Sequence, residues 1–156
     1  MPQAILTAEP VDEAAMAALA RQIAPRLKPG DCLLLDGPIG AGKTAFARAL
    51  IRARLGRDED VPSPTFTLVQ TYDDGTTEIW HCDLYRLTDV TELAELGLET
   101  ALDSAICLIE WPDRMGTMAP QDALSLQFDA LADRHRVRLS GSKAWAERLN
   151  GLRHAG

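Results

Sequence analysis

The sequence lacks long hydrophobic runs and contains few cysteines. Its longest apolar stretches, such as Cys32 to Leu35 and Ala105 to Ile109, are far too short to cross a bilayer. The first residues contain neither a basic segment nor a long apolar one, so we expect no signal peptide. Without a CxxC pair, an odd number of cysteines excludes a disulfide scaffold or a zinc site and favours buried, reduced thiols. These thiols are Cys32, Cys82 and Cys107. We therefore expect a soluble cytoplasmic protein with no membrane partner.

Positive charge is scarce as well. Sixteen Lys and Arg stand against 23 Asp and Glu, which gives a net charge of −7. Nucleic-acid binders usually carry a basic surface, so this balance argues against tight nucleic-acid binding by this chain alone. The segment 134–153 is the exception, with six basic residues against the single acid Glu147. It is either a solvated strand and helix or a contact for a polyanion such as tRNA.

Repeats, low-complexity tracts and linkers are also missing. The chain of 156 residues is 46% hydrophobic and 25% charged, values typical of one domain with its own core. A domain of this length should bury about two-thirds of the surface of its unfolded chain. We therefore expect one domain over residues 1–156, in which a short helix and tail follow from about residue 141.

Apolar spacing and turn residues predict alternating strands and helices. Pro25 lies near the end of the first helix and favours an earlier end. The apolar runs 31–36 and 105–110 are typical of parallel strands buried on both faces, whereas 65–72 and 77–83 form a hairpin around the turn 73–76. The pattern predicts an α/β sheet with antiparallel additions. Helices are predicted over 11–27, 43–55, 89–103 (broken near Gly97) and 142–150, and strands over 3–7, 31–36, 65–72, 77–83, 105–110, 123–129 and 134–140.

Residues 37–44 match the pattern G-x-x-x-x-G-K-[ST], between a predicted strand and a predicted helix. The glycines let successive backbone N–H groups turn inward around phosphate oxygens, and the helix adds its positive N-terminal end. Lys43 can reach the β- and γ-phosphates, and Thr44 can offer its hydroxyl to Mg²⁺. The predicted phosphate-binding residues are Gly37, Pro38, Ile39, Gly40, Ala41, Gly42, Lys43, Thr44 and the following Ala45.

Two carboxylates end predicted strands where a Mg²⁺ ligand belongs. Mg²⁺ takes one or two carboxylates beside the phosphates, and P-loop proteins place an acid at the end of a neighbouring strand. Glu110 ends the run 105–109, and Asp83 ends the strand 77–83. Asp36, directly before the loop, could compete with them but is more often structural. The predicted catalytic residues are Lys43, Asp83, Glu110 and Thr65.

Other candidates have two interpretations each. Thr65 lies after Ser63 and Pro64, in a loop that is either a switch segment or an ordinary turn. His81 shares a strand side with Asp83, so the pair could hold a metal, although a lone histidine more often makes a structural hydrogen bond. Arg86 could neutralise phosphate charge or form an ion pair. Trp111 could cover the active site or a partner, or belong to the core.

Four motifs together resemble the TsaE family of bacterial tRNA threonylcarbamoyladenosine biosynthesis. They are Gly37-x4-Gly42-Lys43-Thr44, Ser63-Pro64-Thr65-Phe66, His81-x-Asp83-Leu84-Tyr85-Arg86-Leu87 and Glu110-Trp111-Pro112. The resemblance implies a three-layer P-loop NTPase fold with a mixed, mainly parallel sheet and antiparallel additions. It implies ATP binding and slow hydrolysis with Mg²⁺. It also implies assembly with TsaB and TsaD, which modify adenosine 37 of ANN-decoding tRNAs. The chain would then contact tRNA only indirectly, through this complex.

The same resemblance assigns roles to individual residues. It implies that residues 37–44 bind phosphates, that Thr44 and Glu110 hold Mg²⁺, and that Asp83 and Thr65 form the switch and catalytic side. It places Trp111 beside the nucleotide, together with residues near Glu13 and Arg134, or Arg136 in place of Arg134.

For the reaction, we expect an in-line water to attack the terminal phosphate, while Lys43, Mg²⁺ and the loop N–H groups stabilise the charge. No residue is an obvious arginine finger, so we expect weak activity alone and regulation by partners. Two alternatives remain open. One is a small-molecule or nucleoside kinase. The other is an assembly module in which nucleotide binding, with little turnover, is the output.

Overall fold

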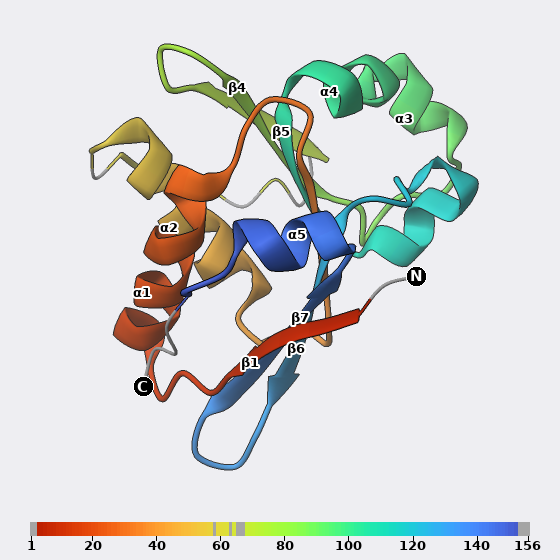
Figure 1. Ribbon diagram of the computed structural model, residues 1–156. Helices are drawn as coiled ribbons and strands as arrows, with labels where there is room; N and C mark the ends of the chain where they lie inside the picture. The colour runs from red at the N-terminus through yellow and green to blue at the C-terminus, as the bar shows by residue number, and fades with distance from the viewer. Residues whose placement is uncertain (1–2, 58, 63, 65–67, 153–156) are drawn as a thin grey trace.

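The computed structural model describes residues 3–57, 59–62, 64 and 68–152. Within them, one seven-stranded sheet runs through the molecule in the order β1-β7-β6-β2-β5-β4-β3 (Figure 1). The strands are β1 (Gln3–Ala8), β2 (Cys32–Asp36), β3 (Val69–Asp73), β4 (Glu78–Asp83), β5 (Ile106–Glu110), β6 (Leu124–Ala130) and β7 (His135–Gly141).

The four central strands are parallel. β2 pairs in parallel with β5 and β6, and β4 pairs in parallel with β5. The outer strands are antiparallel: β7 lies against β6, β1 against β7, and β3 against β4. The continuous apolar run of β5 is buried along its whole length because helices cover both faces of the sheet there. The predicted mixed α/β sheet is therefore confirmed.

Helices form a layer on each side of the sheet, as the packing of its two faces demonstrates. Leu33 and Leu35 of β2 belong to the larger core, which includes residues of α1 (Glu13–Ile23), α2 (Lys43–Leu55) and α5 (Lys143–Arg148). Cys32 belongs to the smaller core, with residues of α3 (Thr91–Glu95), α4 (Leu98–Ser104) and the 3₁₀ helix η2 (Pro112–Met118). In Figure 1, α3 and α4 lie apart from α1, α2 and α5. All three cysteines are buried and unbridged in the smaller core, as predicted.

Helix α1 differs from the prediction at both ends. Asp12 caps it by accepting a hydrogen bond from the Ala15 N–H, so the helix begins at Glu13 and leaves Val11 58% exposed. It ends at Ile23, and the chain continues as the 3₁₀ helix η1 (Ala24–Arg26), in which Pro25 lacks the N–H that an α-helix needs.

The other helices agree closely with the prediction. α2 covers residues 43–55, and α3 and α4 meet at Gly97, whose φ is 83°. η2 was not predicted. β3 begins at Val69, and residues 65–67 of its predicted strand lie outside the described residues. Of the helices in the described part of the chain, none has the length and apolar character to span a membrane.

Candidate active site

The glycine loop connects the end of a parallel strand to the start of a helix. β2 ends at Asp36, whose carboxylate accepts a hydrogen bond from the Gly37 N–H at 2.9 Å, and α2 begins at Lys43. Gly42 precedes the helix with a φ of 103°, and a Cβ there would lie 2.6 Å from Cε of Met16. The left-handed backbone conformation strains any larger residue, and a Cβ would also displace the flexible end of the Met16 side chain, so the loop favours glycine at this position.

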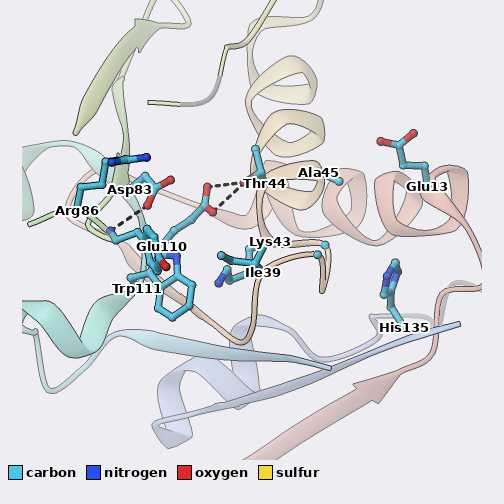
Figure 2. Close-up of a pocket in the computed structure, with 13 residues that line it drawn as sticks. Glu13, Ile39, Lys43, Thr44, Ala45, Asp83, Arg86, Glu110, Trp111 and His135 are labelled. Carbon is cyan, nitrogen blue, oxygen red and sulfur yellow. Dashed lines mark hydrogen bonds between the residues drawn. The ribbon is translucent and has the colours of Figure 1, made fainter. Parts of the chain in front are cut away.

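The carboxyl ends of three parallel strands bring the predicted acids together beside this loop. The register pairs Leu35 of β2 with Glu110 of β5, and Asp83 of β4 with the same Glu110. A pocket of about 550 Å³ opens at this edge, lined by Lys43, Thr44, Asp83 and Glu110 among others (Figure 2). Its volume lies within the range of small-molecule sites, which in open α/β sheets occur at the carboxyl ends of the strands.

Lys43 is the buried cation of the site, with 5% of its surface exposed. Its Nζ donates a hydrogen bond to the Gly37 carbonyl and lies 3.7 Å from the centroid of the Trp111 ring. Burial lowers the pKa of the Lys43 ammonium, while the nearby carboxylates of Glu110, Asp36 and Asp83 oppose that shift. A desolvated cation beside a pocket is suited to bind an anion.

Trp111 forms one wall of the pocket. It adopts left-handed backbone angles (φ 61°), which are uncommon for a bulky residue, at the point where β5 passes into η2. This conformation turns the half-buried ring over Lys43 and against Tyr85, at 4.9 Å between ring centroids. Of the two interpretations of Trp111, the site position fits the geometry, although the ring also packs against the smaller core.

Glu110 is held by two other side chains of the site. The Thr44 hydroxyl lies 2.9 Å from Oε1 and 3.2 Å from Oε2, and Nε2 of His81 lies 2.7 Å from Oε2. Glu110 is 2% exposed and Asp83 is 7% exposed. Asp83 accepts a hydrogen bond from the Tyr85 N–H at 3.1 Å, which holds its carboxylate at the end of β4.

Most predicted site residues lie at this pocket. Gly37, Pro38 and Ala41 belong to the loop without lining it, and Asp36 supports the loop through the Gly37 N–H. Arg86 lines the pocket next to Tyr85. Thr65 lies outside the described residues. The predicted residues that line the pocket are Ile39, Gly40, Gly42, Lys43, Thr44, Ala45, Asp83 and Glu110.

The far wall of the pocket comes from Glu13 and His135 (Figure 2). Glu13 was expected here from the family resemblance, whereas His135 was missed. Arg134 and Arg136, the expected partners, pair with Glu9 instead, at 2.8 and 3.3 Å. Side chains alternate along a strand, so a shift of one residue along β7 changes which of them faces the pocket.

Several basic side chains of the C-terminal stretch have carboxylate partners. Besides the two arginines on Glu9, Arg138 pairs with Asp129 at 2.8 Å. Arg148 pairs with Asp31 and lies over the Trp145 ring. Their charge is thus largely balanced within the fold, which favours the solvated interpretation of this stretch over a polyanion contact.

Comparison with known proteins points to one family. The family model for threonylcarbamoyl adenosine biosynthesis protein TsaE matches residues 11–138. A TsaE protein of Rickettsia bellii is 41% identical over 118 residues, covering 76% of this chain and 82% of the relative. A TsaE protein of Bacillus subtilis is 38% identical over 120 residues, covering 76% and 74%.

A solved structure extends the agreement to the fold. The crystal structure of Bacillus subtilis YdiB superposes with a TM-score of 0.76 at 29% identity, covering 96% of this chain and 93% of that one. The strand–glycine loop–helix unit and the order of the sheet identify the fold as that of P-loop NTPases. The chain belongs to the TsaE family of tRNA threonylcarbamoyladenosine biosynthesis proteins.

Proposed function

We propose that this protein binds ATP with Mg²⁺ and hydrolyses it slowly in the cytoplasm, in support of the TsaB–TsaD complex that threonylcarbamoylates adenosine 37 of ANN-decoding tRNAs. One observation carries the proposal. The Thr44 hydroxyl, directly after the glycine loop, lies 2.9 Å from the Glu110 carboxylate at the edge of a pocket of about 550 Å³. Threonine and strand-end acid are the Mg²⁺ ligands of P-loop ATPases.

The residues fit a nucleoside triphosphate. Lys43 supplies a buried positive charge. The first N–H groups of α2 have no hydrogen-bond partner within the helix, so they are available to phosphate oxygens at the loop. Phosphate oxygens can replace the contacts that Lys43 makes with Gly37 and Trp111. The loop reads phosphates and not the base, so the choice of ATP rests on the family.

The donor set also fits Mg²⁺. Mg²⁺ prefers hard oxygen ligands and is usually bound through one or two carboxylates and the phosphates of the substrate. Thr44, Glu110 and Asp83 offer a hydroxyl and two carboxylates at one edge of the sheet. Bound there, Mg²⁺ would offset negative charge on the phosphates.

In the hydrolysis that we propose, a water oxygen bonds to the γ-phosphorus as the bond to the β–γ bridging oxygen breaks, giving ADP, inorganic phosphate and a proton. Lys43 and the loop N–H groups stabilise the developing charge, and Asp83 orients the water. An arginine supplied from outside can add about 10³–10⁵ in rate to such sites. The exposed apolar side chains of Ile39 and Tyr85 at the pocket rim suit a partner that covers it.

The test is release of phosphate from ATP with Mg²⁺, by the purified chain alone and with the TsaB–TsaD heterodimer. We expect a slow basal rate that changes when the heterodimer is added. Glu110→Gln should lower the rate. Glu78→Gln, at the opposite end of the neighbouring strand β4, is the matched control and should leave it unchanged.

A lack of any change, together with no ATP-dependent complex, would contradict the partner-regulated ATPase. Transfer of phosphate to an acceptor other than water would support a kinase instead.

A further inference from the structure

His81 is fully buried in the sheet face that carries the larger core. It lies on β4 between Ile79 and Asp83, and the register pairs it with Leu108 of β5. Ile79 and Leu108 are core residues. Side chains two apart on a strand share a face, so His81 lies among the apolar residues of this face. It precedes by two positions Asp83, the residue with which β4 reaches the pocket.

Within the described part of the chain, the ring has one hydrogen-bonding partner, and that partner is a site residue. Nε2 of His81 lies 2.7 Å from Oε2 of Glu110. A carboxylate that binds Mg²⁺ is ionised and can only accept, so in the proposed site Nε2 carries the hydrogen. Nδ1 is buried and has no hydrogen-bond partner among the described residues. Leaving a polar atom unpaired is unfavourable, and an apolar side chain at this position would avoid it.

Neither nitrogen is placed to bind a metal directly. Nε2 is occupied by Glu110, and Nδ1 is enclosed in the protein. The His-x-Asp pair that the sequence left open as a metal site is therefore divided between two tasks. Asp83 lines the pocket, and His81 supports the carboxylate beside it.

The remaining contacts of Glu110 indicate what His81 contributes. Among the described residues, Oε1 accepts a hydrogen bond from the Thr44 hydroxyl at 2.9 Å, whereas Oε2 is contacted by His81 and, at 3.2 Å, by the same hydroxyl. The Thr44 hydroxyl has one hydrogen, so it can donate to only one Glu110 oxygen well, while its lone pairs would remain available to Mg²⁺. The hydrogen bond from His81 keeps Oε2 in place and leaves Oε1 directed to the Thr44 side.

We propose that His81 is a positioning residue whose Nε2–H fixes the Glu110 carboxylate and thereby sets the Mg²⁺ affinity of the nucleotide site. The inference rests on the proposed function. Hydrogen-bond partners behind metal ligands typically contribute about 10- to 100-fold in metal affinity. We therefore expect loss of the His81 N–H to weaken Mg²⁺ binding and to leave nucleotide binding without Mg²⁺ unchanged.

The experiment compares His81→Leu, His81→Gln and Ile79→Val with the unmodified chain. The leucine removes the N–H, and the glutamine places an amide N–H near the position of Nε2. Ile79→Val removes one buried methylene from the same face and is the control for a disturbed core. Calorimetry measures the affinity for a non-hydrolysable ATP analogue in EDTA and across a Mg²⁺ titration, and thermal unfolding measures stability.

The expected result is a separation of the two affinities. In EDTA all four proteins should bind the analogue within about threefold of one another. The Mg²⁺ concentration at half-maximal enhancement should rise about 10-fold or more in His81→Leu. It should stay near the starting value in His81→Gln and Ile79→Val.

The proposal is overturned if His81→Leu keeps the Mg²⁺ dependence of the unmodified chain, or if His81→Gln loses as much as His81→Leu. If the unmodified chain itself shows no Mg²⁺ enhancement, the proposed function fails whatever the variants do. Should His81→Leu not fold, the glutamine variant and ¹⁵N NMR of the unmodified ring decide. NMR should find a hydrogen on Nε2, and an Nε2 without hydrogen would refute the proposed hydrogen bond.

Discussion

Helix α2 carries a cation at each end, the buried Lys43 and the half-buried Arg54, and the surroundings of the two cations differ. At its last turn, Arg54 pairs with Asp74 at 2.8 Å and donates to the carbonyls of Ala24 and Leu27. At its first residue, Lys43 donates to one carbonyl and lies over an aromatic ring beside the pocket. Both ends are bounded by a glycine in the left-handed conformation, Gly42 and Gly56.

The difference separates stability from binding. The partners of Arg54 come from the chain itself, and the positive charge of Arg54 suits the negative C-terminal end of the helix dipole. Lys43 lies at the positive end, where the dipole repels a cation and attracts an anion. Its unfavourable position in the free protein is the feature that a phosphate would relieve. The same helix therefore holds the fold together at one end and, in the proposed function, binds the phosphates at the other.

The largest effect is expected at the binding end. Lys43→Ala should lower ATP hydrolysis by about 100-fold or more, because a charge that stabilises the phosphates is lost from a water-poor site. The free energy of unfolding should change little, since Lys43 donates to a carbonyl and lies over an aromatic ring, neither of which is a carboxylate that would be left unpaired. Phosphate release and urea unfolding measure the two effects, and an active Lys43→Ala protein would refute the site.

Arg54→Ala should give the opposite result. It leaves Asp74, whose side chain is only 5% exposed, without its cation, which we expect to cost about 3 kcal/mol of unfolding free energy. Hydrolysis per folded molecule should remain unchanged. Arg138→Ala is the matched control, because its pair with Asp129 is more exposed and should be worth under about 1 kcal/mol. Equal losses in the two variants would contradict a special role for Arg54.

Acid should weaken the same end of the helix. Burial alone would raise the pKa of Asp74, but hydrogen bonds from Thr76 and Thr77 and the charge of Arg54 lower it from 3.8 to about 2. A lowered pKa stabilises the folded state above about pH 4, and this contribution, about 2 kcal/mol, is lost as the pH falls toward 2.

The stability difference between the unmodified chain and Asp74→Asn should therefore shrink between pH 4 and pH 2. Urea unfolding across this range provides the measurement. A difference that stays constant with pH would mean that the folded and unfolded states bind the Asp74 proton equally.

The smallest effect is expected at the C-terminal cap. Gly56→Ala places an alanine at a φ of 71°, which should cost about 1 kcal/mol, or about 2–4 °C in Tm for a domain of this size. A Cβ at Gly56 meets no described atom within 4 Å, so only the backbone conformation is strained. Gly42→Ala should lose more, because its Cβ must also displace the end of the Met16 side chain, and it should weaken nucleotide binding because Gly42 lies directly before Lys43 in the loop. Equal losses of stability and of nucleotide binding in the two variants would contradict the different roles of the two ends of α2.

Features that depend on neighbouring residues could be predicted well. The limits of α2 agree with the prediction because the glycine loop and Gly56 lie beside it in the chain. The break at Gly97 was recognisable for the same reason. The start of α1 was placed too early, since the apolar spacing included Val11, while the Asp12 side chain decides where the helix begins.

By itself the sequence determined the phosphate loop, the strand-end acids Asp83 and Glu110 and the α/β pattern, because periodicity and turn chemistry act over a few residues. The tertiary structure decided which side chains meet. His81 and Glu110 are 29 positions apart, and Glu13 and His135 reach the pocket from opposite parts of the chain. Such contacts depend on strand order and register, and a shift of one residue in register exchanges the side chains on the two faces of a strand.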